Sequence, residues 1–195
     1  MQGRIVPVLG LLTSLLIVAR LGAVAQSLQF AREELTVVVS GSYCDVTAFY
    51  TFHNPTNSPM RQQLFYPLPA HQPFPDSLSV ADLAAGTVVP YTVSTKGISF
   101  EIDCAPHTDR TYCIRFRQRT PQQSIEYILT TTRAWARPLE HARFVFVIPC
   151  EYALTASSFP PDRQTDQDGV RTYTIEKREF MPDRDLTVRW KRRLP

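Results

Sequence analysis

The histidines are the first residues in this sequence to examine for chemistry. They are His53, His71, His107 and His141. Each lies in or beside a segment that contains proline, and no two have the spacing that would place two metal ligands on one face of a helix. A single histidine in a loop is usually solvated. We therefore expect no catalytic histidine, no metal site and no cofactor.

The cysteines are explained better by disulfides than by catalysis or zinc binding. They are Cys44, Cys104, Cys113 and Cys150, and no two form a C-x-x-C pair. An even number of cysteines in an exported chain predicts two disulfides, although four cysteines permit three pairings. Proximity in sequence favours Cys104–Cys113, which leaves Cys44–Cys150. Strand alternation places Cys104 and Cys113 on opposite faces, so that bridge would require a bulge or a twisted loop.

An acidic segment near the C-terminal third of the chain has part of a calcium-binding pattern. Asp166-x-Asp168-Gly169 resembles the middle of a calcium loop, in which oxygens at alternate positions surround the ion. If Gln164 is counted as the first position of such a loop, Ile175 stands at the twelfth, where calcium loops have a bidentate glutamate. An Asp-Gly pair accepts the positive φ angles of a tight turn. We predict a polar hairpin here.

Arginines and aromatic residues offer two candidate binding surfaces. Arg115, Arg117 and Arg119 alternate along one predicted strand, where they would either grip anions or form the ordinary solvated face of a sheet, and we favour the solvated face. Tyr66, Phe74 and Trp135 lie at strand ends rich in proline and are the candidates for an exposed binding patch. The competing interpretation is that Trp135 plugs one end of the fold.

The elements that must position these residues are strands. No segment has sustained apolar residues at i, i+3 and i+4, whereas apolar and polar residues alternate repeatedly. The predicted strands are 35–40, 43–52, 62–66, 77–83, 88–94, 98–103, 112–119, 124–132, 142–148, 170–177 and 186–190. Short strands at regular spacing predict an all-β protein, an antiparallel β-sandwich of about ten short strands.

Several short motifs resemble known proteins. Tyr50-x-Phe52-x-Asn54, followed by the segment 65–69 (Phe-Tyr-Pro-Leu-Pro), resembles the opening of vault/inter-alpha-trypsin (VIT) type domains. The segments 127–132 and 180–186 look like parts of uncharacterised exported bacterial proteins of all-β build. The sequence departs from the VIT pattern after the Pro-Leu-Pro stop. The resemblance implies an all-β fold and no catalytic residue.

The N-terminus has the features of a cleaved signal peptide. Arg4 precedes an apolar run of 15 residues, 5–19, and the small residues of Ala23-Val24-Ala25 predict cleavage before Gln26. The run is shorter than the ~20 residues that span a bilayer. We expect a signal peptide over residues 1–25, a single β-sandwich domain over residues 26–195, no membrane span in the mature chain, and a periplasmic or extracellular location.

Charge and motifs together limit the function. Residues 1–25 hold two of the 21 basic residues and no acidic ones, so cleavage lowers the formal net charge from +3 to +1. Such a small charge argues against binding nucleic acid through a basic field. We expect a non-enzymatic module that binds a protein or cell-envelope partner through its surface. A carbohydrate-binding module is the alternative, and a hydrolase of unfamiliar type is third.

Overall fold

The structure is a computed structural model that describes residues 27–193. The predicted signal peptide and its cleavage site lie outside the described residues. Within residues 27–193, no helix is long and apolar enough to cross a membrane.

The described chain is built almost entirely of strands. Fourteen strands and one short 3₁₀-helix, η1, occur between residues 27 and 193. The elements are β1 (Gln29–Ser40), β2 (Tyr43–His53), β3 (Met60–Pro67), β4 (Ser77–Asp82), β5 (Thr87–Val88), β6 (Tyr91–Ser94), β7 (Gly97–Cys104), β8 (Asp109–Arg119), β9 (Ser124–Tyr127), η1 (Thr130–Trp135), β10 (Leu139–Pro149), β11 (Tyr152–Ser157), β12 (Arg163–Gln167), β13 (Val170–Phe180) and β14 (Leu186–Arg192). The predicted all-β sandwich-like fold is confirmed.

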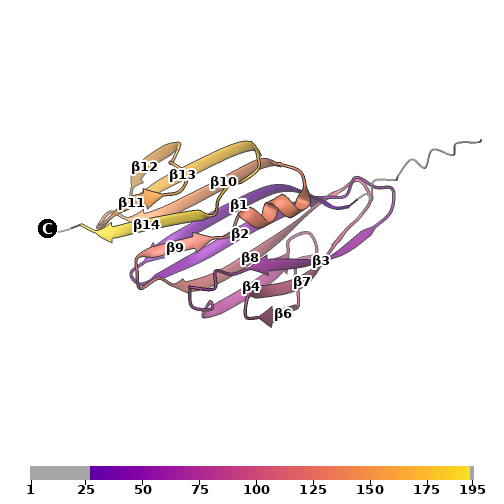
Figure 1. The fold of residues 1–195 in the computed structure, drawn as a ribbon, viewed down its shortest axis with the longest axis horizontal. Helices are drawn as coiled ribbons and strands as arrows, with labels where there is room; N and C mark the ends of the chain where they lie inside the picture. The colour runs from indigo at the N-terminus through magenta and orange to yellow at the C-terminus, as the bar shows by residue number, and fades with distance from the viewer. Residues whose placement is uncertain (1–26, 194–195) are drawn as a thin grey trace, which may run out of the picture.

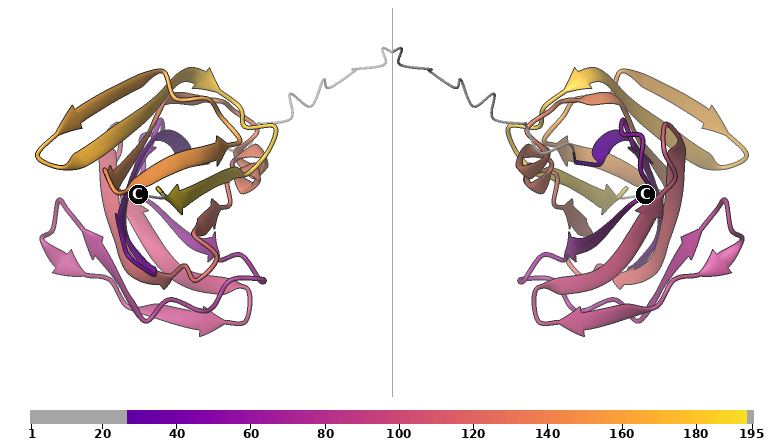
Figure 2. Two further views of the ribbon diagram at one scale, coloured as in Figure 1. Left: turned by 90° about the vertical axis from the view of Figure 1, so that its left-hand side faces the viewer. Right: turned by 90° about the vertical axis from the view of Figure 1, so that its right-hand side faces the viewer.

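One large sheet and two small sheets make up the fold (Figure 1). The large sheet has the strand order β12-β13-β10-β1-β2-β8-β4-β5, and the small sheets have the orders β11-β14-β9 and β3-β7-β6. Seen from the end, the large sheet curves around the small ones (Figure 2). Every strand pair is antiparallel except β1 with β10, which run parallel within the described residues. The parallel pair departs from the purely antiparallel sheet that was expected.

The core lies between the large sheet and the small ones because alternate residues of each strand face inward. On β1, Leu35, Val37 and Val39 are all buried. The inward side chains of β7 and β14, such as Ile102 and Trp190, are buried in the same core. Alternation of this kind, read from the sequence, predicts which face of each strand is covered.

The segment after β9 differs from the prediction. The strand predicted over 124–132 ends at Tyr127, and η1 follows it. The carboxylate of Asp185 accepts hydrogen bonds from the backbone N–H groups of Leu129 and Thr130, both at 2.9 Å. These bonds satisfy donors at the start of η1 that a short helix leaves without partners.

The acidic segment forms the predicted hairpin. Strands β12 and β13 pair antiparallel across a turn at Asp168 and Gly169, with φ values of 51° and 76°. Both residues thus adopt the positive φ angles of a tight hairpin turn. Strands β11 and β12 were not predicted. Every residue of β12 is exposed, so the strand has no apolar alternation to reveal it.

The two predicted disulfides are not formed, and all four cysteines are free thiols. Cys104 faces the core from β7, whereas Cys113 lies on the other face of β8, beside Phe49 and Ala81. Strand alternation in the sequence had already placed these two cysteines on opposite faces. Strand β1 separates β2, which carries Cys44, from β10, which ends next to Cys150. Two strand spacings amount to about 9–10 Å, beyond the roughly 7 Å between Cα atoms that a disulfide allows.

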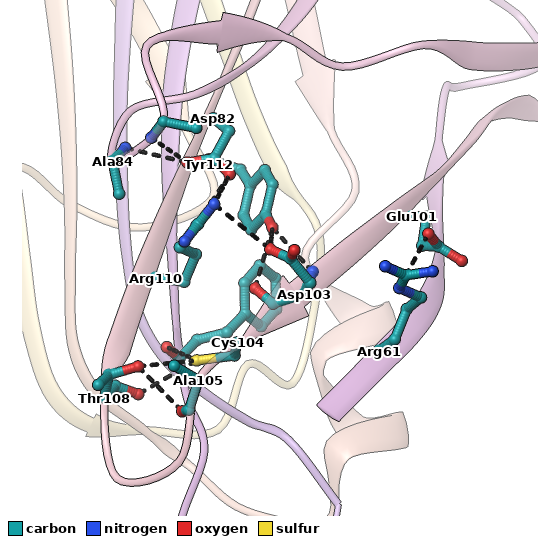
Figure 3. Close-up of polar contacts among 12 residues, drawn as sticks. Arg61, Asp82, Ala84, Glu101, Asp103, Cys104, Ala105, Thr108, Arg110 and Tyr112 are labelled. Carbon is teal, nitrogen blue, oxygen red and sulfur yellow. Dashed lines mark hydrogen bonds and ion pairs between the residues drawn. The ribbon is translucent and has the colours of Figure 1, made fainter. Parts of the chain in front are cut away.

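Charged residues connect the large sheet to β7. Other charged residues cover the outer face of the large sheet. Figure 3 shows Arg110 between Asp82 and Asp103, with Arg110 Nε 2.8 Å from the Asp82 carboxylate. Burial alone would raise the pKa of Asp82, but Arg110 and nearby backbone N–H groups outweigh it, so the pKa is lowered. On the outer face Arg117 binds Asp45 through two hydrogen bonds, as the solvated-face interpretation of the arginines predicts.

Candidate functional site

A cavity lies where the two small sheets approach each other over the large sheet. Strand β3 forms one wall, and β9 with η1 forms the other. Strands β1, β2 and β8 supply the floor. The cavity has a volume of about 60 Å³, which exceeds the room that one water molecule needs. Eight of its fifteen lining residues are aromatic, among them Phe30, Tyr50, Tyr66 and Trp135.

Glu33 is the charged residue of this cavity. It lies on β1 at the position two before Leu35, so strand alternation turns its side chain toward the core, and its exposed fraction is 2%. Its Oε1 accepts a hydrogen bond of 2.5 Å from Tyr127, while its Oε2 is buried and has no partner. Burial raises the pKa of Glu33 to about 7, although the bond from Tyr127 acts to lower it.

Three tyrosines surround the Glu33 carboxyl group. Because the single hydroxyl proton of Tyr127 goes to Glu33, Tyr50 donates its own proton to the Tyr127 oxygen. The ring of Tyr66 lies 5.9 Å from that of Tyr50 and 6.3 Å from that of Tyr127, measured between centroids. Burial raises the pKa of all three hydroxyl groups, so they stay neutral hydrogen-bond donors near pH 7.

The short helix η1 places Trp135 at the side of the cavity. The Trp135 ring centroid lies 5.9 Å from that of Phe30 and 5.4 Å from that of Phe52. Trp135 is half-buried and packs against the core. The side chain therefore covers the edge of the core and also lines the cavity, so the two interpretations of Trp135 are not exclusive.

Strand β3 is held in place by a close approach of its partner β7. Pro67 pairs with Gly97, which has a φ of 149°. A Cβ atom at Gly97 would lie 2.1 Å from the backbone oxygen of Tyr66. Only glycine fits here without moving β3. Gly97 thereby sets the position of the wall that carries Tyr66.

Comparisons with known proteins bear mainly on the fold. Residues 115–189 match a family described as "Domain of unknown function (DUF4424)", a match that covers less than half of the chain. None of the curated protein sequences compared with the chain is similar to it.

Among solved structures, the chain resembles a Legionella pneumophila protein provisionally named a nutrient binding protein, with a TM-score of 0.65 and 14% identity. This similarity covers 84% of the chain and 66% of that protein. An M1 zinc metallopeptidase from Deinococcus radiodurans has a TM-score of 0.48 and 14% identity over 84% of the chain and 42% of the peptidase. The chain thus spans less than two thirds of the length of either protein. At such low identity, the similarity to the Legionella protein shows a shared fold alone. None of these similarities involves a VIT-type domain, so that resemblance stays a prediction from the sequence.

The structure brings together two of the three residues predicted as a binding patch. Tyr66 and Trp135 both line the cavity, but Tyr66 is buried rather than exposed. Phe74 lies outside the residues that line the cavity and is 45% exposed. The predicted exposed aromatic patch is thus replaced by an aromatic cavity that includes Tyr66 and Trp135.

Sequence reasoning missed Glu33, although the sequence contains a signal for it. Glu33, Leu35, Val37 and Val39 are spaced two residues apart, and the last three are obvious core residues of a strand. A carboxyl group on that face must be buried, and a buried carboxyl group needs a partner or a proton. Parity along β1 therefore identifies Glu33 as unusual.

The lining residues combine aromatic rings with a single carboxyl group. Glu33 is the one carboxyl group that lines the cavity, and the lining includes no histidine, lysine or arginine. Across residues 27–193, no group of three or more His, Cys, Asp or Glu side chains is placed to hold a metal ion. The arrangement offers an aromatic enclosure, one carboxyl group and neutral hydroxyl donors.

Proposed function

We propose that this protein is an exported, non-enzymatic binding module that takes a small ligand into the aromatic cavity around Glu33. The observation that carries the proposal is the buried Oε2 of Glu33, which has no hydrogen-bond partner beside a cavity large enough for a small group. A buried polar atom without a partner is unfavourable, and a ligand that supplies one would remove this penalty.

Two further observations support a binding role. The signal-peptide pattern of residues 1–25 favours a periplasmic or extracellular location, where binding proteins meet their ligands outside the cytoplasm. The Legionella protein of similar fold is provisionally named a nutrient binding protein. Because the cavity has one carboxyl group, it offers no pair of carboxyl groups for acid and base, which supports binding over hydrolysis.

A rim substitution tests whether the cavity is the binding site. Thr131 lines the cavity and is exposed, so Thr131→Trp should fill the entrance without disturbing the core. Ala134→Trp is the matched control, because Ala134 is exposed on the same helix and lies outside the lining. Saturation-transfer NMR would measure binding from a mixture of amines, amino acids, monosaccharides and small carboxylic acids.

We expect some of these compounds to bind the natural protein and Ala134→Trp but not Thr131→Trp. A monosaccharide that binds in this way would support the carbohydrate-binding alternative. If no compound binds, or if Thr131→Trp leaves binding unchanged, the proposal is wrong.

A protein or cell-envelope partner is the second candidate. Strand β3 is at the edge of its small sheet, and its Phe65 is 49% exposed. An edge strand with an exposed aromatic residue offers backbone groups and apolar surface to an extended peptide. Phe65→Ser should then abolish partner capture, and because Phe65 also lines the cavity, Thr131→Trp, which fills the cavity, should leave that capture unchanged. Unchanged capture in Phe65→Ser would remove this candidate.

A further inference from the structure

We infer that the ligand of the cavity carries a protonated amine, which donates an N–H hydrogen bond to Glu33 and lies among the aromatic rings. The inference rests on the proposed function and specifies the chemical class of the ligand.

Charge is the first argument for an amine. Glu33 has Ala142 of β10 and Tyr50 of β2 as its register partners on the two neighbouring strands. Tyr127 of β9 bonds to it, and Tyr66 of β3 packs against both tyrosine rings. On η1, Arg133 is exposed and binds the backbone oxygen of Pro182. None of the titratable groups facing the carboxyl group is a cation.

A buried carboxylate with no cation beside it is strongly unfavourable, and a ligand cation would compensate it. An anionic ligand would place a like charge next to Glu33, which opposes binding. A neutral ligand would leave the carboxylate without compensation. The charge pattern of the cavity therefore selects a cation.

The free oxygen of Glu33 is the second argument. Oε1 is already used by Tyr127, whereas Oε2 has no partner. An ammonium group has N–H donors and no acceptor, so it matches a lone carboxylate oxygen. Hydrogen bonds between two charged groups are about twice as strong as those between neutral groups.

The aromatic lining is the third argument. A cation is attracted to the faces of aromatic rings, and this attraction is larger when water is excluded. Phe30, Phe52 and Trp135 form one cluster at the cavity, and Tyr66 closes it from β3. Rings on several sides of one carboxyl group are a suitable enclosure for an ammonium head group.

Such a site must couple binding to the proton on Glu33. The amine pairs with the ionised carboxylate, so a proton on Glu33 competes with the ligand. The raised pKa of Glu33, about 7, places this competition near neutral pH. Below that pH, affinity should fall by about tenfold for each pH unit while the amine itself stays protonated.

Isobutylamine and isobutanol are the probes for this inference, because they share a carbon skeleton and differ in charge. Calorimetric titration of the natural protein at pH 8 should show the amine binding at least about tenfold more tightly than the alcohol. In Glu33→Gln the amine should lose this advantage. Glu34→Gln is the matched control, since Glu34 is the next residue of β1, is exposed and lies outside the cavity lining.

The outcomes separate the inference from the proposed function. Tighter binding of the amine that is lost in Glu33→Gln, is kept in Glu34→Gln and weakens below pH 7 supports the inference. If the alcohol binds as tightly as the amine, or if Glu33→Gln keeps the preference, the inference is wrong while the cavity remains a binding site. Amine binding that survives Thr131→Trp overturns both, and so does failure of every probe and compound to bind.

Discussion

Glu33 makes the stability of the protein depend on pH in an unusual direction. Its pKa is raised from 4.5 to about 7 on folding, so the folded protein holds a proton that the unfolded chain releases. Its contribution to stability is therefore full below pH 4.5 and falls as the pH rises to about 7. A shift of this size corresponds to roughly 3 kcal/mol.

Glu33→Gln should remove this pH dependence. Glutamine cannot ionise, so the variant should be more stable than the natural protein at pH 8, by a few kcal/mol at most, and nearly equal to it below pH 4.5. Chemical unfolding at pH 4, 6 and 8 measures the difference, with Glu34→Gln as the control. A difference of the same size at all three pH values would show that folding does not change the pKa of Glu33.

The four thiols give a second test at single residues. Cys44, Cys104 and Cys113 are buried, and burial raises the pKa of Cys44 to about 12, so the reactive thiolate is scarce. Cys150 is only half-buried. Iodoacetamide without reductant should modify Cys150 first in the folded protein and all four cysteines after unfolding in guanidinium chloride. Two disulfides would leave none to modify in either state.

At the scale of elements, alternation predicts strands wherever one face is covered. Strand β2 is predicted almost to its observed ends because its inward residues are all buried. Strand β12 has no covered face, so no alternation marks it. Helix η1 depends on a contact with Asp185, far along the chain, which local pattern does not reveal. Tyr66 and Trp135 were predicted as site residues. That they line the same cavity as Glu33 depends on how the sheets pack on each other, which local sequence patterns do not show.

The position of β3 is also set at the scale of elements, through Gly97. Gly97→Ala would place a methyl group 2.1 Å from the Tyr66 backbone oxygen and would force alanine to adopt a φ of 149°. We expect a loss of at least about 3 kcal/mol, since strained backbone and overpacking each contribute. Gly86→Ala is the control, because Gly86 also has a positive φ but open space around it.

The control should lose only about 1 kcal/mol. Thermal unfolding monitored by circular dichroism measures both losses. Equal losses would mean that β3 can move away from β7 with little loss of stability. Gly97 would then not determine the position of the cavity wall that β3 forms. Tryptophan fluorescence, to which Trp135 at the cavity and the buried Trp190 both contribute, should change in Gly97→Ala and stay constant in Gly86→Ala.

At the scale of the whole molecule, the cavity exists because the second layer is divided. Strands β9 and β3 are edge strands of different small sheets, and no ladder of backbone hydrogen bonds joins them within residues 27–193. Side chains fill most of the seam, and the remaining space is the cavity. A continuous second sheet would have covered Glu33 completely. The division thus leaves a cavity next to a buried carboxyl group, and this cavity is where the proposed ligand would bind.

The fold also restricts where the predicted signal peptide can be removed without loss of a core residue. Leu28, just before β1, is 1% exposed and belongs to the core. Cleavage before Gln26, as the sequence predicts, keeps Leu28 in the mature chain. A protein that begins at Gln26 should therefore unfold at the same temperature as the naturally exported protein. A protein that begins at Gln29 lacks Leu28 and should be less stable by about 2–5 kcal/mol, as for other losses of a buried leucine.

Intact-mass spectrometry of the protein isolated from its natural source should find its N-terminus at or next to Gln26. Retention of residues 1–25, or cleavage after Leu28, would contradict this prediction, because the first keeps the signal peptide and the second removes a core residue.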